Sequence, residues 1–181
     1  ATGAIDIHVK SGGVTLDAGA ANGSFTQIGH GGTGGTGGGL IAAPISITFC
    51  DDEVGDVSLL ASSGTGSYAH IGHGGNAWSG DKQGAILIDG ANDVVMSGGG
   101  ANSYAQVGHG GAGVSGAYGT GESSGSIEFL DIAGDVTMTG GNAGNSYSQI
   151  GHGGVRSSGY FAGNVSVAAG GSITGTGGSS D

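Results

Sequence analysis

Four copies of one phrase decide the fold of this chain: Ser24-Phe-Thr-Gln-Ile-Gly-His-Gly-Gly32, Ser67-Tyr-Ala-His-Ile-Gly-His-Gly-Gly75, Ser103-Tyr-Ala-Gln-Val-Gly-His-Gly-Gly111 and Ser146-Tyr-Ser-Gln-Ile-Gly-His-Gly-Gly154. Their histidines are separated by 43, 36 and 43 residues. Recurrence at such intervals predicts a repeat protein, in which equivalent residues of stacked repeats form rows. We therefore interpret the phrase as rows of stacked side chains.

Two further apolar segments precede the phrase in each repeat. The first alternates, as Ile5-Asp-Ile7-His-Val9, Ile45-Ser-Ile47-Thr-Phe49, Ile86-Leu-Ile88, Ile127-Glu-Phe129 and Val165-Ser-Val167. The second is Val14-Thr-Leu16, Val57-Ser-Leu59, Val94-Val-Met96 and Val136-Thr-Met138, with a weaker Ile173-Thr-Gly175. Alternation with a period of two predicts strands. The phrase itself supplies the third strand of each repeat.

Three short strands joined by glycine-rich corners predict an all-β fold, a single-stranded parallel β-helix or β-solenoid. The whole chain, 1–181, is expected to form one solenoid segment of four full coils and a partial fifth. The coils are placed at about 4–32, 45–75, 85–111, 126–154 and 164–181. Glycine-rich loops are expected to protrude after each phrase, at 33–44, 76–84, 112–125 and 155–163.

Composition argues against several classes of function. The net charge of −11, with three basic residues, disfavours nucleic acids and anionic membranes as partners. No run approaches the roughly 18 apolar residues of a membrane span, and the single Cys50 cannot form an internal disulfide. Serine, histidine and aspartate recur in rows, whereas a catalytic residue is usually singular, and no nucleophile or metalloprotease motif occurs. We expect no enzyme.

The histidine row permits two interpretations. Alternation places the histidines on the same face as the inward Ile28, Ile71, Val107 and Ile150. Imidazoles about 4.8 Å apart are candidate ligands for zinc or copper. We favour a packing row of neutral imidazoles that bond to one another, to water or to corner carbonyls, because no carboxylate or thiolate lies at a fixed offset. The row consists of His30, His73, His109 and His152.

The opposite face of the third strand is predicted to point outward. Its aromatic and amide rows favour sheet stabilisation, lateral docking of another solenoid, or stacking on sugar rings. The residues of this outward contact ladder are Phe25, Tyr68, Tyr104, Tyr147, Gln27, His70, Gln106 and Gln149.

An acidic row precedes the second strand. Asp56, Asp93 and Asp135 are expected to accept backbone N–H groups of their own turns, and calcium bridging is the alternative. The nonapeptide of calcium-binding β-rolls is missing, so no cofactor is expected, with calcium or zinc as less favoured options. A further acidic corner, at Asp51, Asp52 and Glu53, is predicted to be solvated.

The repeats at 56–75, 93–111 and 135–154 resemble those of very large bacterial exoproteins of the filamentous haemagglutinin type, through their Asp-Val-x-Leu/Met strands and Ser-Tyr-Ala-Gln-Ile-Gly-His-Gly-Gly phrase. The resemblance spans nearly the whole chain. It implies a right-handed parallel β-helix, exported across the outer membrane by a partner and displayed as a long adhesive or structural fibre. The amino-terminal secretion domain of that family has no counterpart in this sequence.

The expected function is therefore that of a non-catalytic, secreted structural protein on a bacterial surface, as a segment of an adhesin stalk or a subunit of a self-assembling filament. Self-association, end to end or side by side, is expected because a terminal coil leaves strand edges unpaired. The alternative is an adhesive module that recognises cell-surface glycans or metal ions through the outward ladder, the loops or the histidine row. An ice-binding solenoid would need a flat threonine array, and the threonines are scattered.

Overall fold

The protein is a stack of parallel strands. The computed structural model describes residues 3–35, 39–50, 55–113 and 122–179, and the acidic corner at Asp51, Asp52 and Glu53 lies outside them. These described residues form strands, turns and loops without a helix, so none long and apolar enough to cross a membrane is found among them. The prediction of an all-β chain built from stacked parallel strands is confirmed.

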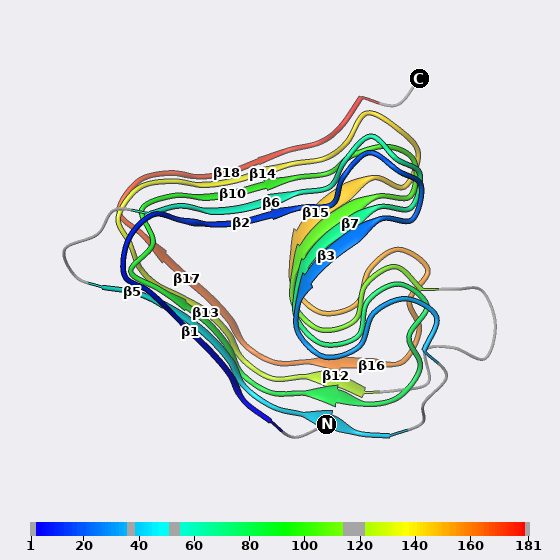
Figure 1. Ribbon diagram of the computed structural model, residues 1–181, viewed down its shortest axis with the longest axis horizontal. Coiled ribbons are helices and arrows are strands. Elements are labelled where there is room, and N and C mark those ends of the chain that lie inside the picture. The colour runs from blue at the N-terminus through cyan, green and yellow to red at the C-terminus, as the bar shows by residue number, and fades with distance from the viewer. Residues whose placement is uncertain (1–2, 36–38, 51–54, 114–121, 180–181) are drawn as a thin grey trace.

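Two sheets contain five strands each. The first sheet takes one strand from each successive repeat: β1 (Ile5–Val9), β5 (Ile45–Phe49), β9 (Ile86–Asp89), β13 (Ile127–Ile132) and β17 (Val165–Ala169). The second sheet is formed in the same way by β2 (Val14–Asp17), β6 (Val57–Leu60), β10 (Val94–Ser97), β14 (Val136–Thr139) and β18 (Ile173–Thr176). Figure 1 shows these sheets as two sides of the cross-section, with the strands of successive repeats one behind another.

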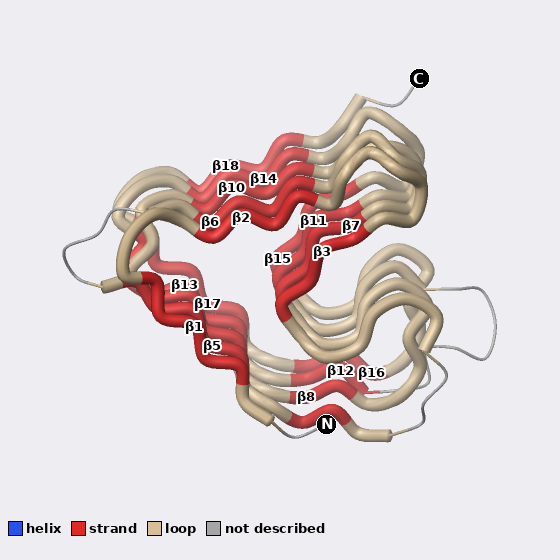
Figure 2. Tube along the Cα trace, viewed as in Figure 1, coloured by secondary structure: helices blue, strands red, loops and turns tan. Residues whose placement is uncertain are grey.

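The other two sheets contain four strands each. The phrases form the third sheet, with β3 (Phe25–Ile28), β7 (Tyr68–Ile71), β11 (Tyr104–Val107) and β15 (Tyr147–Ile150). The fourth sheet consists of β4 (Ile41–Ala42), β8 (Lys82–Gln83), β12 (Glu122–Ser124) and β16 (Tyr160–Ala162). All four sheets are visible as red bands in Figure 2.

The fourth sheet corrects the prediction of three strands per repeat. Its strands lie inside the segments 33–44, 76–84, 112–125 and 155–163, which were expected to be protruding loops. Each of these segments pairs with the equivalent segment of a neighbouring repeat, as Ile41 does with Lys82. The segments therefore close the cross-section and return the chain to the first sheet (Figure 1).

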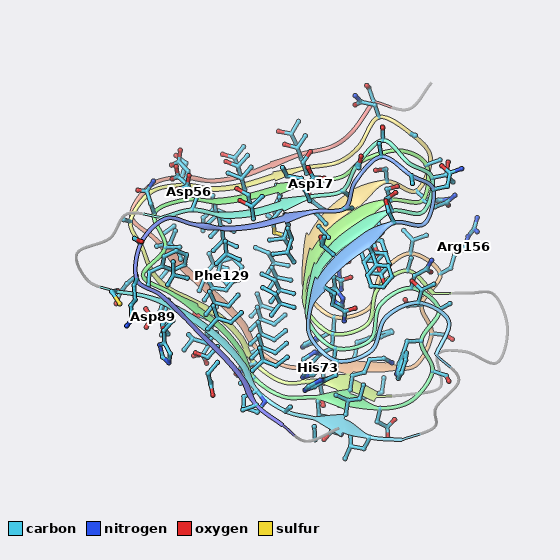
Figure 3. All side chains as sticks on the ribbon, in the orientation of Figure 1. Asp17, Asp56, His73, Asp89, Phe129 and Arg156 are labelled. Atoms are coloured by element: carbon cyan, nitrogen blue, oxygen red, sulfur yellow. The ribbon has the colours of Figure 1, made fainter. Side chains whose placement is uncertain are left out.

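The apolar core lies between the first three sheets. Register places Ile47 against Ile88, and Ile88 against Phe129, so that each inward position is a column of apolar side chains. Ala69 and Ile71 of the third sheet also belong to this core, as the strand alternation predicts. Phe129 points into this interior in Figure 3, whereas Asp56 lies at an outer corner. Burial of apolar area, at about 25 cal/mol per Å², is shared between neighbouring repeats.

Candidate functional site

The phrases of the third sheet are in exact register. Tyr104 of β11 pairs with Tyr68 on one side and with Tyr147 on the other, and the remaining positions follow in step. Parallel pairing of identical positions turns each residue of the phrase into a row along the stack. These rows are the features of the molecule that distinguish it from a plain apolar solenoid.

The aromatic row is a continuous stack. Neighbouring ring centroids are 4.8 Å apart for Phe25 and Tyr68, 4.9 Å for Tyr68 and Tyr104, and 5.3 Å for Tyr104 and Tyr147. The interplanar angles lie between 2° and 9°. Contacts of this kind contribute about 0.5 to 1.5 kcal/mol per pair beyond the area that they bury.

The prediction that this face points outward is wrong in the middle of the stack. Tyr68, His70, Tyr104 and Gln106 are completely buried, and only Phe25, in the first repeat, is well exposed. Tyr147, Gln27 and Gln149 are half-buried. A surface that binds sugars or another solenoid through the middle of this ladder is therefore not present.

The cover over this face comes from the chain that follows each phrase. The Thr33 hydroxyl lies 3.0 Å from the Tyr68 hydroxyl, and the corner glycines Gly75 and Gly111 lie beside the hydroxyls of Tyr68 and Tyr104. Burial raises the pKa of the Tyr68 and Tyr104 hydroxyls, against smaller opposing effects of the Thr33 hydroxyl on Tyr68 and of nearby backbone groups on both. The third sheet thus has a packed interior on both faces.

The amide row joins each repeat to the next. The Gln27 Nε2 donates to the carbonyls of Gly72 and Gly74, at 2.9 and 3.0 Å. The Gln106 Nε2 likewise donates to Gly151, at 2.8 Å, and to Gly153. Each side chain thereby adds hydrogen bonds to corner carbonyls of the next repeat.

His70 occupies the same row with an imidazole in place of an amide. Its Nε2 donates to the carbonyl of Gly108 at 2.5 Å, which leaves Nδ1 as a buried acceptor without a hydrogen-bond donor. Desolvation lowers the pKa of His70 to about 4, against the raising effect of the Gly108 carbonyl. The ring is therefore neutral at physiological pH.

The histidine row at the end of the phrase is a second stack, with ring centroids 4.9 to 5.1 Å apart. The backbone N–H of His30 donates to the Nδ1 of His73 at 3.0 Å. The same bond joins His73 to His109 at 3.1 Å, and His109 to His152 at 2.9 Å. Each inter-repeat step is thus bridged by a backbone-to-imidazole hydrogen bond.

The second ring nitrogen fixes the tautomer. The Nε2 of His73 donates to the Ala43 carbonyl at 2.8 Å, and the Nε2 of His109 donates to Gly84 at 2.9 Å. His152 bonds to Gly125 at 3.0 Å in the same way. Because Nδ1 accepts and Nε2 donates, each of these rings is neutral with both nitrogens occupied. His73 lies between the third and fourth sheets in Figure 3.

Burial holds these rings neutral. Desolvation lowers the pKa of His109 to about 3, and it also lowers the pKa values of His73 and His152. A metal ion would have to displace an existing hydrogen bond at each of these rings. Among the described residues, no three histidine, cysteine or carboxylate side chains are grouped to hold a metal ion, and the zinc and calcium alternatives stay predictions.

The acidic row also bridges repeats. Asp56 Oδ1 accepts the backbone N–H of Asp93 at 3.2 Å, and Asp93 Oδ1 accepts that of Asp135 at 2.7 Å. Asp135 Oδ1 accepts the N–H of Ser172 at 2.7 Å. Each carboxylate therefore binds the next repeat, and the prediction of a bond within its own turn is wrong. The stacked charges are compensated in part by these donors.

The serine that begins each phrase forms a row to which sequence reasoning assigned no bonding role. The Ser67 Oγ donates to the carbonyls of Gly64 and Ala21, at 3.0 and 3.1 Å, and the Ser103 Oγ donates to Gly64 at 2.7 Å. Ser146 reaches Gly99 at 2.9 Å. The signal was present, because serine opens all four phrases directly after a glycine-rich corner.

The two ends of the stack carry most of the exposed apolar side chains. Among the described residues, seven large apolar side chains are exposed, and Leu130 is the one that lies outside the end layers. The other six are Phe25 and Leu40 in the first repeat, and Tyr160, Phe161, Val165 and Ile173 in the last strands. The end layers therefore carry most of the exposed large apolar side chains of the described residues.

The stacked rows and apolar ends are what the structure offers for function. Most polar groups of the rows form hydrogen bonds between neighbouring repeats. At the two ends, by contrast, apolar side chains are exposed and strand edges are unpaired. No family model matches the chain, and no curated protein or solved structure is significantly similar to it.

Proposed function

We propose that this chain is a non-catalytic structural protein that stacks end to end into a filament or forms part of a stalk. The observation that carries the proposal is the position of the exposed apolar side chains on the two end layers. Those layers also present open edges of parallel sheets, which are templates for further strands. An apolar open edge at both ends suits a molecule that continues its own stack.

The register within the molecule supports this way of stacking. If β1 of a second molecule follows β17, Val165 meets Ile5 and Val167 meets Ile7, in continuation of the pairs Ile127–Val165 and Phe129–Val167. If β2 follows β18, Ile173 meets Val14. Every one of these junction pairs is apolar, as in the interior.

The acidic row is interrupted where two molecules would meet. The positions equivalent to Asp56, Asp93 and Asp135 are Ser172 in the last repeat and Gly13 in the first. A junction therefore places no carboxylate of this row against another. For a chain with a net charge of −11, this lowers the electrostatic cost of end-to-end contact.

The handedness and number of the coils and the location of the protein are part of the same proposal. We take the coil to be right-handed, with four full coils and a partial fifth, and the protein to be secreted to a bacterial surface as adhesin-stalk or filament material. The resemblance of the repeats to exoproteins of the filamentous haemagglutinin type supports this setting. Rows occupied by inter-repeat hydrogen bonds support a structural role over a catalytic one.

Sedimentation velocity and electron microscopy over a range of concentrations test the proposal. We expect mass to rise with concentration and rods with an axial repeat of about 4.8 Å to form. Ile173→Lys, on the end layer, is expected to keep the protein monomeric because it places a charge in the apolar junction. Leu130→Lys, at the exposed apolar residue outside the end layers, is the matched control and is expected to assemble normally.

Two results would contradict stacking. One is a wild-type protein that stays monomeric at every concentration while its thermal unfolding shows an intact fold. The other is equal assembly of Ile173→Lys and Leu130→Lys, which would show that the end layer is not part of the interface.

Glycan binding is supported by one feature of the side of the molecule. A cleft of about 180 Å³ lies between the corner that precedes the third sheet and the chain that follows it, and it is lined by Asn76, Asn102 and Asn145. Amide side chains in a cleft suit sugar hydroxyl groups. Binding of a glycan by wild type, and its loss in Asn102→Ala, would favour this second function.

A further inference from the structure

The carboxylates of this chain avoid one part of every repeat. All 14 acidic residues lie outside four stretches of the sequence, 18–50, 57–80, 94–121 and 136–180. Each stretch contains one copy of the phrase and the corners on both sides of it. Because Lys10 and Lys82 also lie outside these stretches, Arg156 is the one charged residue within them, histidines aside. Negative charge is therefore kept away, along the sequence, from the phrases and their corners.

Figure 3 shows a corresponding separation in space. Asp56 and Asp89 lie on one side of the cross-section, and Arg156 lies on the opposite side. The Arg156 side chain is exposed. A chain with a net charge of −11 has many carboxylates that could pair with a guanidinium, yet none occurs in the sequence between residues 136 and 180. The Arg156 cation is therefore open to an anionic ligand.

Arg156 is one of the residues that line the cleft of about 180 Å³ beside the third sheet. Three amide side chains line the same cleft, those of Asn76, Asn102 and Asn145. The other lining residues are apolar or glycine, so no carboxylate borders this site. The lining residues come from the second, third and fourth repeats. The cleft is therefore a polar, positively charged hollow on the side of the stack.

Three of these side chains are placed by an unfavourable backbone conformation. Asn102, Asn145 and Arg156 have φ values of 57°, 58° and 60°, in the left-handed region that favours glycine. The equivalent positions of earlier repeats are glycines in the same conformation, Gly23, Gly66 and Gly34. Glycine adopts this conformation without the steric cost, so the corner itself does not require these side chains. Their presence favours a contact outside the fold.

Two of the amides are already joined to each other. The Asn145 Nδ2 donates to the Asn102 Oδ1 at 3.0 Å. This bond leaves the Asn102 Nδ2 as a donor and the Asn145 Oδ1 as an acceptor for a ligand. A neighbouring donor and acceptor suit the hydroxyl groups of a sugar ring, each of which both donates and accepts. Because the pair is ordered before binding, less side-chain entropy is lost when a ligand enters.

We propose that this cleft binds the carboxylate-bearing ring of an acidic glycan, a uronate or a sialic acid. The Arg156 guanidinium binds the carboxylate through paired N–H donors, and the asparagine amides bind the ring hydroxyls. The volume of about 180 Å³ is smaller than the roughly 300 to 1,000 Å³ of sites for drug-sized ligands, which suits a single ring. This inference rests on the glycan binding given above as the second function, and it adds the class of glycan.

Two pairs of probes, matched except for charge, test the proposal. One pair is a galacturonate trimer and its methyl ester, and the other is sialyllactose and lactose. We expect the acidic member of one pair to bind the full chain and to shift the side-chain amide signals of Asn102 and Asn145 in NMR spectra. Its neutral partner is expected to bind about tenfold more weakly or worse, because it lacks the charged hydrogen bonds. The pair that binds distinguishes a uronate from a sialic acid.

Arg156→Gln removes the charge and keeps a long polar side chain. We expect it to weaken binding of the acidic probe about tenfold and to leave binding of the neutral probe unchanged. Lys10→Gln is the matched control, since it changes the net charge equally at an exposed residue outside the cleft, and it is expected to bind as wild type does. Asn102→Gly, which introduces the residue found at Gly66, is expected to weaken binding of both probes. Thermal unfolding shows whether each variant retains the fold.

The outcomes separate the acidic ligand from glycan binding itself. Equal binding of the acidic and neutral members of a pair would overturn the carboxylate site and support a cleft for neutral sugars. Equal loss in Arg156→Gln and Lys10→Gln would show that net charge, and not the cleft, governs binding, and would overturn the site. If none of the four probes bound a folded wild-type protein, both the carboxylate site and the second function would be overturned.

Discussion

At the scale of single residues, the rows show which side-chain positions a period-two pattern predicts correctly and which it does not. Alternation correctly assigns Ile71 to the core, but it assigns the opposite face of the strand to solvent, and Tyr68 and His70 on that face are buried. A strand pattern separates two faces without showing what covers the second one. The cover is a neighbouring length of chain, and its path depends on glycine corners whose direction the sequence does not determine.

The histidines make stability depend on pH. His70 and His109 have pKa values of about 4 and about 3 in the folded protein, and an unfolded histidine titrates near 6.5. Above pH 6.5 both states are neutral and stability is complete. Below it the unfolded state binds more protons, so the free energy of unfolding falls towards acid. At pH 5 the loss is about 2 kcal/mol for each such buried histidine.

Urea unfolding at pH 7.5 and pH 5.0 measures this loss of unfolding free energy. The variant His70→Gln shows how much of the loss comes from His70. Glutamine suits the position because Gln27 and Gln106 occupy the same row and bond to two carbonyls each. We expect the variant to retain wild-type stability at pH 7.5 and to lose less on acidification. His8→Gln, at an exposed ring, is the control. An identical loss in wild type and His70→Gln would contradict the assignment.

At the scale of elements, the strands with clear alternation were predicted and the short ones were not. The first three strands of each repeat contain β-branched or aromatic residues in alternation, a pattern that tertiary packing preserves. The strands of the fourth sheet are two or three residues long and lie among glycines. Apolar pairs such as Leu40-Ile41 and Tyr160-Phe161 were the available signal, but pairs are too short to show a period.

The corner after the third strand requires glycine. Gly72 has a φ of +152°, and a Cβ at this position would overlap the carbonyl of Gly108 and contact the His70 ring. We expect Gly72→Ala to lower the free energy of unfolding by about 3 kcal/mol, because both strain and overlap must be relieved. Urea unfolding measures this loss.

Gly144→Ala is the control for the corner, since a Cβ at Gly144 meets no atom within 4 Å. Its effect is expected to stay within about 0.5 kcal/mol. If Gly72→Ala were as stable as Gly144→Ala, neighbouring repeats would be able to move apart at this corner. That result would contradict the claim that the corner requires glycine.

At the scale of the whole molecule, charge and end-layer chemistry act against each other. Every repeat inside the stack is held by strand ladders and by the amide, histidine and acidic rows, whereas the last repeat has these partners on one side. In the proposed stacking, the net charge of −11 would repel a second molecule, whereas the apolar end layers would attract it. The balance between repulsion and apolar contact would then set the proportions of single molecules and rods.

Salt tests this balance. Raising ionic strength from about 0.01 M to 0.15 M shortens the Debye length from about 30 Å to 8 Å, which screens the repulsion and leaves apolar contact unaffected. We therefore expect association, followed by sedimentation at 10 and 150 mM NaCl, to strengthen several-fold with salt. Ile173→Lys is expected to stay monomeric at both concentrations. Association that weakens with salt would show that ion pairs, and not the apolar end layers, hold the molecules together.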